Sequence, residues 1–150
     1  MLSKIRNACA SDLDRIVALN YDSSWQVKDY EQMLHNNNYY FKVCTFNGVL
    51  IGFLTAQLSF DFNEVLQVCV DDQFRKKGYA SLLFDDFICM SLNKEIFLDV
   101  NVKNEAALKL YTKKGFKEIS RRKKYYNYVD DAIIMKREAV IENVNSRNRI

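Results

Sequence analysis

Apolar and polar positions alternate along the chain with two spacings, about two residues in some segments and about 3.6 in others. The segments with period two are expected to form strands at residues 3–10, 39–46, 49–60, 64–70, 96–102, 116–128 and 132–138. Helical spacing is found at residues 11–19, 25–35, 78–92 and 104–114. The predicted order is β-α-α-β-β-β-α-β-α-β-β. Because tight turns join the middle strands, we expect an α/β domain (α+β, with a mixed sheet) and not a doubly wound Rossmann domain.

Short turn and cap signals mark the boundaries of these segments. Asn47 and Gly48 separate two apolar runs, and this dipeptide strongly favours a two-residue hairpin. Ser11, with Asp14 three residues later, is expected to cap the first helix. Gly115 follows the last predicted helix and suits the position just beyond its C-terminus.

The composition fits one folded domain over residues 1–150. Hydrophobic residues make up 49% of the chain and charged residues 27%, which is typical of a globular protein. No proline, linker or repeat divides the chain, and the polar residues 139–150 are expected to form a frayed tail. The apolar stretches are shorter than the roughly 20 residues of a membrane span, and charges come too early for a signal peptide. We therefore expect a cytoplasmic protein without membrane contact.

Cysteine and histidine usage narrows the chemistry. The cysteines at positions 9, 44, 69 and 89 are widely spaced, which suggests buried free thiols in a reducing compartment. His35 is the only histidine, so a zinc site or a Ser-His-Asp triad would be hard to build, and no metal is expected. Proton transfer is left to carboxylates, tyrosines, water or the substrate itself.

Basic residues gather in the second half of the chain, at 75–77, 113–114 and 121–124, although the net charge is only +3. Such clusters serve a polyanionic ligand, an acidic protein surface or solubility. Because no RNA-binding motif accompanies them, direct binding of nucleic acid is not expected.

The most informative segment is a basic turn between a predicted strand and a predicted helix. It contains Arg75, Lys76, Lys77, Gly78, Tyr79 and Ala80. The unpaired N–H groups at the start of a helix bind phosphate, and a residue without Cβ lets the backbone approach the ligand. Neither GK[ST] nor GxGxxG is present, so nucleotide phosphoryl transfer has no support. The spacing alone leaves two interpretations, an anion site and a solvated turn.

This turn resembles the acetyl-CoA pyrophosphate loop of the GCN5-related N-acetyltransferase (GNAT) family, [RQ]-x-x-G-x-[GA]. A second stretch, residues 98–136, resembles the C-terminal half of the RimI-type branch, the ribosomal-protein alanine N-acetyltransferases. Its matching positions are Asn104, Ala107, Leu110, Tyr111, Gly115, Phe116, Arg121, Arg122, Tyr125, Tyr126, Asp131, Ala132 and Met135. The resemblance implies the GNAT fold, a mostly antiparallel, twisted sheet of about seven strands flanked by about four helices.

The resemblance also implies where acetyl-CoA binds. The pyrophosphate is expected on residues 75–80, and the pantetheine arm on the backbone of Val68, Cys69 and Val70. Asn104 and Tyr111 are seven residues apart, so on a helix they would share one face, toward the cofactor. No acyl-enzyme is needed, and none of the cysteines is assigned as a nucleophile.

The catalytic roles follow from the same resemblance. Tyr111 is expected to protonate the leaving sulfur, because related enzymes use the matching tyrosine in that way; a core tyrosine is the alternative. Asp99 stands where RimI-type enzymes carry a glutamate base. Since aspartate is one methylene shorter, Glu64 and Tyr125 remain alternatives to it.

The acceptor implied by the resemblance is a protein N-terminal α-amine, first of all the N-terminal alanine of ribosomal protein S18. Tyr125 and Tyr126 are expected to flank the peptide, and Arg121 or Arg122 to meet its acidic residues. Acetylation of a small amine or a lysine side chain, and a non-catalytic acetyl-CoA-binding module, remain alternative functions. The sequence does not fix the oligomeric state.

Overall fold

The computed structural model describes residues 2–126 and 129–140. Its elements follow the predicted order of strands and helices. The strands are β1 Ser3–Asn7, β2 Tyr39–Phe46, β3 Val49–Leu58, β4 Phe62–Val70, β5 Glu95–Asn101, β6 Lys117–Tyr126 and β7 Asp130–Arg137. The helices are α1 Leu13–Leu19, α2 Val27–Leu34, α3 Tyr79–Met90 and α4 Glu105–Lys113, with 3-10 turns η1 Ala10–Asp12 and η2 Asp72–Phe74.

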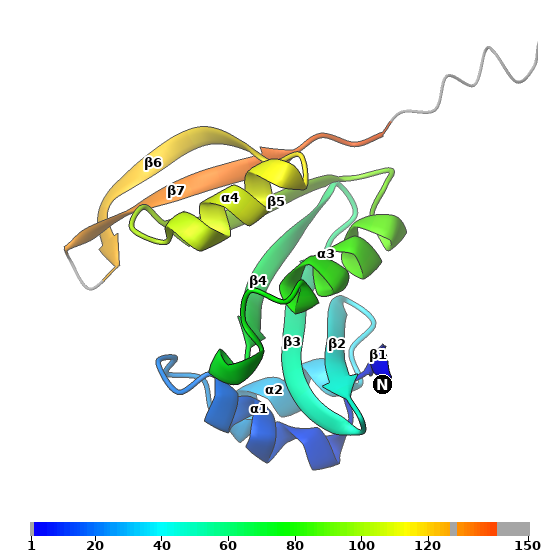
Figure 1. Ribbon diagram of the computed structural model, residues 1–150. Helices are drawn as coiled ribbons and strands as arrows, with labels where there is room; N and C mark the ends of the chain where they lie inside the picture. The colour runs from blue at the N-terminus through cyan, green and yellow to red at the C-terminus, as the bar shows by residue number, and fades with distance from the viewer. Residues whose placement is uncertain (1, 127–128, 141–150) are drawn as a thin grey trace, which may run out of the picture.

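The seven strands form one mixed sheet in the order β1-β2-β3-β4-β5-β7-β6. Every neighbouring pair is antiparallel except β4 and β5, which run parallel. Their pairing is short, from Phe62 opposite Glu95 to Glu64 opposite Phe97. Beyond Glu64 the two strands separate, and Figure 1 shows β4 running down and away from β5. The predicted fold class, with seven strands and four helices, is confirmed.

Helices cover the two faces of the sheet unequally. One face packs against α3 and α4 around a buried cluster that includes Leu54, Leu83, Phe84, Phe87, Ile96, Leu98, Tyr111 and Phe116. On the other face α1 and α2 pack on the N-terminal strands around Leu13, Ile16, Tyr30, Met33, Phe41, Val43, Leu50 and Phe53. In Figure 1 these two helices lie below β2–β4, far from β5–β7. Neither α1 nor α2 therefore covers the second face of β5–β7.

The local signals for turns and helix ends were mostly right. Asn47 and Gly48 both adopt positive φ, 50° and 83°, as a type I′ hairpin turn requires. Gly115, with φ of 92°, follows α4 as predicted, and the Phe116 N–H donates to the Tyr111 carbonyl at 3.0 Å, closing a Schellman motif.

The predicted cap of the first helix was wrong. Asp12, not Asp14, closes the cap, because its carboxylate accepts the Cys9 N–H at 2.8 Å. The same carboxylate is held by two hydrogen bonds from Arg6, at 2.8 and 2.9 Å. The turn η1, which no sequence signal marked, moves the helix start two residues beyond Ser11.

Three expectations concern the whole chain: its polar tail, its lack of a membrane span and its single domain. Most of the predicted polar tail, residues 141–150, lies outside the described residues. Within the described ranges no helix is long and apolar enough to span a bilayer. The assignment of residues 1–150 to one domain stays a prediction.

Candidate active site

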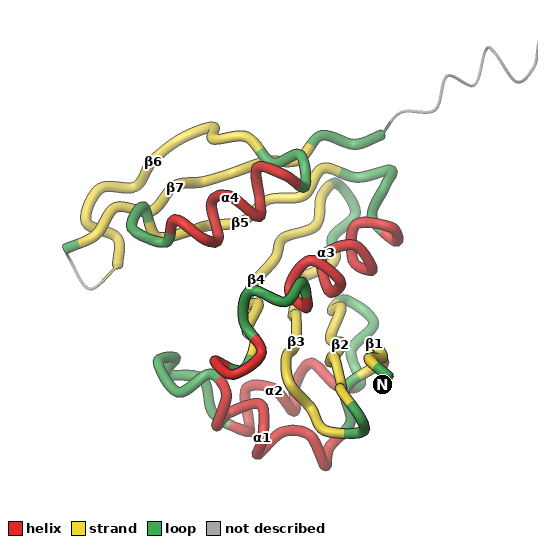
Figure 2. The backbone as a smooth tube through the Cα atoms, viewed as in Figure 1, coloured by secondary structure: helices red, strands yellow, loops and turns green. Residues whose placement is uncertain are grey.

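The basic turn is joined to β4 by a short braced connection, drawn in Figure 2 as a loop interrupted by η2. The Asp71 carboxylate accepts the Gln73 N–H at 2.9 Å and so caps η2. Arg15 of α1 binds the same carboxylate at 2.6 Å, and its Nε donates to the Leu50 carbonyl at 3.3 Å. These contacts fix the direction in which the chain enters the turn.

Gly78 begins α3 in a conformation that favours glycine. Its φ is +90°, and a Cβ placed there would meet no atom of the described residues within 4 Å, so the space beside it is open. No side chain caps the helix, and its first turn contains no acidic residue. The N–H groups of the first turn of α3, which include those of Tyr79 and Ala80, have no intrahelical partner, and they lie next to this open space in the chain. This arrangement suits a phosphate.

The charged side chains of the turn are placed around this helix start. Arg75 donates to the Val70 carbonyl at 3.4 Å and pairs with Asp72 at 3.0 Å, and both charged groups are largely exposed. The Lys77 ammonium lies 5.6 Å from the centroid of the Phe74 ring. Lys76 adopts a positive φ of 60°, which turns the backbone toward Gly78. The basic side chains thus lie around the start of α3, and the space beside Gly78 remains open.

Three aromatic rings support the turn from below. Phe46, Phe74 and Tyr79 have ring centroids 5.7 to 6.3 Å apart, and all three pack against the larger core cluster. The aromatic part of Tyr79 thus contributes packing, while its backbone N–H belongs to the open helix start. A ligand bound at the turn would meet a supported backbone.

The strand that precedes the turn has one paired edge and one free edge. Val68, Cys69 and Val70 pair with β3 on one side. On the other side the pairing with β5 has already ended at Glu64. One extra residue, Leu66, interrupts the register between β3 and β4 and forms a bulge. Among the described residues, the backbone groups that face β5 beyond this bulge have no strand partner, and such an edge could receive an extended ligand.

A glycine opposite this strand allows its close approach to β3. A Cβ on Gly52 would lie 2.8 Å from the Cys69 carbonyl oxygen and 3.2 Å from a Val70 methyl group. Any larger residue at this position would displace β4, and with it the entry to the turn.

Tyr111 lies on the inner side of α4, only 7% exposed. Its ring packs against Phe84 and Phe116, with centroids 5.2 and 6.1 Å away. Burial, with a smaller effect of Tyr126, raises the pKa of Tyr111 to about 12. The phenol is therefore protonated at neutral pH and can act as a donor.

Asn104 has a different position from the one expected. It is the N-cap of α4, and its side-chain oxygen accepts the Ala107 N–H at 3.2 Å. Asn104 therefore lies before the helix, in a non-helical conformation. The expectation that Asn104 and Tyr111 share one face of a helix, which assumed that both residues are helical, does not hold. The side-chain oxygen of Asn104 is committed to starting α4, and only its amide NH₂ remains for a ligand.

Two carboxylates approach each other where β4 and β5 part. Glu64 is paired with Phe97, and Asp99 lies two residues further along β5, so the three side chains share one face of the sheet. Burial and the negative charge of Asp99 raise the pKa of Glu64, while Arg122 opposes this effect. Glu64 was named only as an alternative base, and the structure places it beside Asp99.

The tyrosines of the last hairpin occupy the same region. Burial and the nearby Asp99 raise the pKa of Tyr126 to about 12. Tyr125 lies edge to face with Tyr126, with centroids 5.2 Å apart. The structure therefore brings Tyr126 near Asp99, with Tyr125 packed against it.

Arg121 is not brought to this region. It lies opposite Ile133, a buried residue of the α4 side, and binds Glu118. The next residue, Arg122, has the opposite orientation because side chains alternate along a strand. Its guanidinium lies 5.3 Å from the centroid of the Tyr125 ring.

A polar network lies beside β4. The Tyr30 hydroxyl donates to Gln67 at 2.7 Å and accepts from Asn20 at 3.1 Å, while Gln67 donates to Ser23 at 3.4 Å. The network anchors the connection between α1 and α2 to β4, on the face that carries Glu64. It joins residues up to 44 positions apart, and no local pattern marks such contacts.

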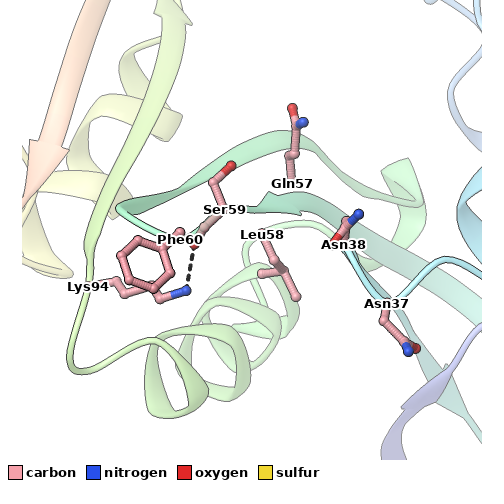
Figure 3. Close-up of a pocket in the computed structure, with 7 residues that line it drawn as sticks. All are labelled: Asn37, Asn38, Gln57, Leu58, Ser59, Phe60 and Lys94. Carbon is pink, nitrogen blue, oxygen red and sulfur yellow. Dashed lines mark hydrogen bonds between the residues drawn. The ribbon is translucent and has the colours of Figure 1, made fainter.

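A separate pocket lies at the opposite end of β3 and β4 from the basic turn. It is lined by Asn37, Asn38, Gln57, Leu58, Ser59, Phe60 and Lys94. Figure 3 shows the Phe60 ring beside Lys94, whose ammonium donates to the Ser59 carbonyl. The pocket contains none of the residues described above. In the part of the chain that the structure describes, no three His, Cys, Asp or Glu residues gather into a potential metal site.

Comparison with known proteins decides the family. A sequence model described as acetyltransferase (GNAT) family matches residues 10–116, well over half of the chain. The chain belongs to the GNAT family. An N-alpha-acetyltransferase of Sulfurisphaera tokodaii is 26% identical over 158 aligned residues, which cover 88% of this chain and 90% of that protein. The ribosomal protein bS18-alanine N-acetyltransferase of Escherichia coli K12 is 33% identical over 98 residues, 61% of this chain and 66% of that protein.

Solved structures agree on the fold of this GNAT protein. The ribosomal-protein-S18-alanine N-acetyltransferase from Escherichia coli matches with a TM-score of 0.84 at 23% identity, covering 96% of this chain and 98% of that one. Arabidopsis thaliana NAA60 in complex with acetyl-CoA matches with a TM-score of 0.78 at 19% identity, covering 90% and 97%. The expected family, fold and enzyme class, an acetyltransferase, are confirmed.

Proposed function

We propose that this protein transfers an acetyl group from acetyl-CoA to the N-terminal α-amine of a protein. The observation that carries the proposal is the free edge of β4, which runs from the two carboxylates at Glu64 and Asp99 to the open start of α3 at Gly78. One extended ligand along this edge would reach from the two carboxylates to the start of α3. The donor and acceptor would then meet where β4 and β5 part.

The residues around the free edge fit acetyl-CoA. The first-turn amides of α3 and the side chains of Arg75, Lys76 and Lys77 would hold the pyrophosphate. The unpaired backbone of Val68–Val70 would hydrogen-bond the pantetheine arm in the manner of a strand. The open space beside Gly78 supports the first of these contacts.

Glu64 and Asp99 are the candidates for the group that takes the proton from the acceptor. An α-ammonium has a pKa of about 7.7–8.0, so it loses its proton far more easily than a lysine side chain, near 10.4. The raised pKa of Glu64 makes it a stronger base than an exposed carboxylate. A modest base is therefore sufficient for an N-terminal amine, which favours this class of acceptor over lysine.

Tyr111 is the candidate donor to the leaving group. As the amine bonds to the acetyl carbon, the carbon–sulfur bond breaks and its electron pair remains on sulfur. A thiol has a pKa of about 8.5, well below that of Tyr111, so the phenol stays protonated and donates a hydrogen bond to the developing thiolate. The proton that the carboxylates take from the amine balances the one that the thiol finally carries.

The preferred acceptor is the N-terminal alanine of ribosomal protein S18, acetylated in the cytoplasm. Its support is the similarity to the Escherichia coli bS18-alanine N-acetyltransferase, 33% identical over 98 residues. Tyr126, near Asp99, and the adjoining Tyr125 would contact the peptide after its first residue.

The test is release of CoA thiol from acetyl-CoA with three kinds of acceptor: N-terminal peptides that begin with alanine or another residue, N-terminally blocked lysine peptides, and polyamines. We expect turnover with the N-terminal peptides and the highest kcat/KM for the S18 sequence. A preference for lysine peptides or polyamines would move the protein to another acetyltransferase specificity. Tight binding of acetyl-CoA without turnover on any acceptor would leave only a binding module.

A further inference from the structure

We infer that Arg122 selects acceptors that carry a carboxylate side chain on one of the two residues after the acetylated amine. This inference rests on the proposed function and narrows its class of substrates. Residues 121–124 are four consecutive basic residues, and the inference assigns a role in substrate specificity to only one of them, Arg122.

Strand register places Arg122 on the acceptor side of the sheet. Arg122 lies opposite Ala132, and Ala132 lies opposite Asn101, two residues from Asp99 on β5. Paired residues of neighbouring strands point to the same face, so Arg122 shares its face with Asp99. The opposing effect of Arg122 on the pKa of Glu64 agrees with this placement.

The neighbouring cations are engaged elsewhere. Arg121 points to the α4 side and binds Glu118, and Lys123 lies 3.8 Å from Asp131. Within residues 2–126 and 129–140, no carboxylate forms an ion pair with Arg122. Arg122 is therefore a charged group with capacity for a partner from outside.

The Tyr125 ring orients this free guanidinium. A guanidinium over an aromatic ring keeps its N–H groups at the edge, where they can bind a carboxylate with two parallel hydrogen bonds. The ring also limits the rotamers of a long side chain, which lowers the entropy lost on binding.

The distances suit the residues that follow the amine. An extended peptide advances about 3.4 Å per residue, so the second and third residues begin within about 7 Å of an amine held at Glu64 and Asp99. A basic side chain at these positions would meet the charge of Arg122 and be disfavoured. The carboxylate pair thus holds the amine, and Arg122 reads the charge that follows it.

The experiment compares peptides that share the best first residue of the acceptor panel and differ only in glutamate or glutamine at positions two and three. With the unmodified enzyme, we expect kcat/KM to be about fivefold higher for a glutamate peptide, mainly through KM, as for an interaction of ~1 kcal/mol. In R122Q this ratio should fall to near one. R121Q is the matched control, because it removes the same charge from the other side of the same strand, and it should keep the ratio.

The outcomes separate this inference from the function on which it rests. Turnover with equal kcat/KM for glutamate and glutamine peptides would overturn the inference and leave the acetyltransferase function intact. A preference that survives in R122Q would overturn the assignment to Arg122. Absence of turnover with every N-terminal peptide would overturn the proposed function, and the inference with it.

Discussion

The helices α3 and α4 lie on the same side of the sheet, yet their N-termini are built in opposite ways. α3 begins at a glycine with positive φ, without a side-chain cap and without an acidic residue in its first turn. α4 begins at Asn104, whose side chain accepts an N–H of the first turn, and Glu105 adds a favourable negative charge.

This difference corresponds to different tasks. A helix start with free amides is less stable by itself and gains most from a bound anion. A closed start fixes the helix without a ligand, and α4 carries Tyr111 two turns later, in a packed position against Phe84. We therefore interpret α3 as the helix that binds acetyl-CoA and α4 as the helix that positions Tyr111, the hydrogen-bond donor to the leaving sulfur. Four changes test this comparison.

The largest expected effect is on turnover, in Y111F. Removing the hydroxyl should lower kcat about 100-fold, since loss of one positioned hydrogen-bond donor to a developing negative charge typically costs about 100- to 1,000-fold. The affinity for acetyl-CoA, measured by calorimetry, should change little, because the ring and its packing remain. Y40F is the control: it removes a hydroxyl bound to Asp86, outside the proposed site, and should reduce stability without lowering kcat. An unchanged kcat in Y111F would remove the donor role of α4.

The second effect is on donor binding, in G78D. An aspartate at this position would occupy the free amides of α3 and repel a phosphate, and we expect the Kd for acetyl-CoA to rise about 30-fold, or ~2 kcal/mol. G48D is the matched control. Gly48 also has a positive φ, and a Cβ at its position would likewise have no neighbour within 4 Å, but it lies in the hairpin between β2 and β3. If both variants bind acetyl-CoA equally well, the open start of α3 is only a turn.

A smaller effect, on stability, is expected in N104A. Loss of an N-cap side chain costs about 1 kcal/mol, which corresponds to a Tm lower by about 2–4 °C in a chain of this size. The Kd for acetyl-CoA should change less than threefold. A tenfold rise in Kd at unchanged Tm would show instead that Asn104 holds the cofactor directly, and the contrast between the two helix starts would disappear.

The smallest expected change is in the pH dependence of kcat/KM, which reports on the proposed base. The proposed base must be deprotonated, so kcat/KM should fall as pH decreases through the raised pKa of Glu64. In D99N a negative neighbour is lost, the pKa of Glu64 falls, and the acid limb should move to lower pH. E64Q should remove this limb. A limb that stays in place in both variants would assign the base to another group.

Part of this architecture could be read from local sequence patterns. The hairpin at Asn47 and Gly48 and the end of α4 at Gly115 depend on backbone conformations that few residues adopt, so the residue type predicts the structure. The first helix cap could not be read in this way. Its acceptor, Asp12, is held by Arg6 across a turn, and Ser11 offered an equally plausible local alternative.

The candidate site likewise has parts that local sequence patterns predict and parts that they do not. The turn at residues 75–80 and the motif around Tyr111 are contiguous, so their resemblance to a family pattern could be recognised in the sequence, although spacing alone left a solvated turn as an alternative at residues 75–80. The pairing of Glu64 with Asp99, and the choice of Arg122 over Arg121, were not visible in the sequence. Which side of the sheet a strand residue occupies depends on register, and one bulge reverses it.

The sequence by itself determined the order of elements, the position of the basic turn and the family, because each depends on residues close together in the chain. Tertiary structure alone decided where β4 leaves β5, and so which carboxylates, tyrosines and arginine meet at one place. The physical reason is that the parallel pairing ends after three residues, a property of how two distant segments pack and not of either segment.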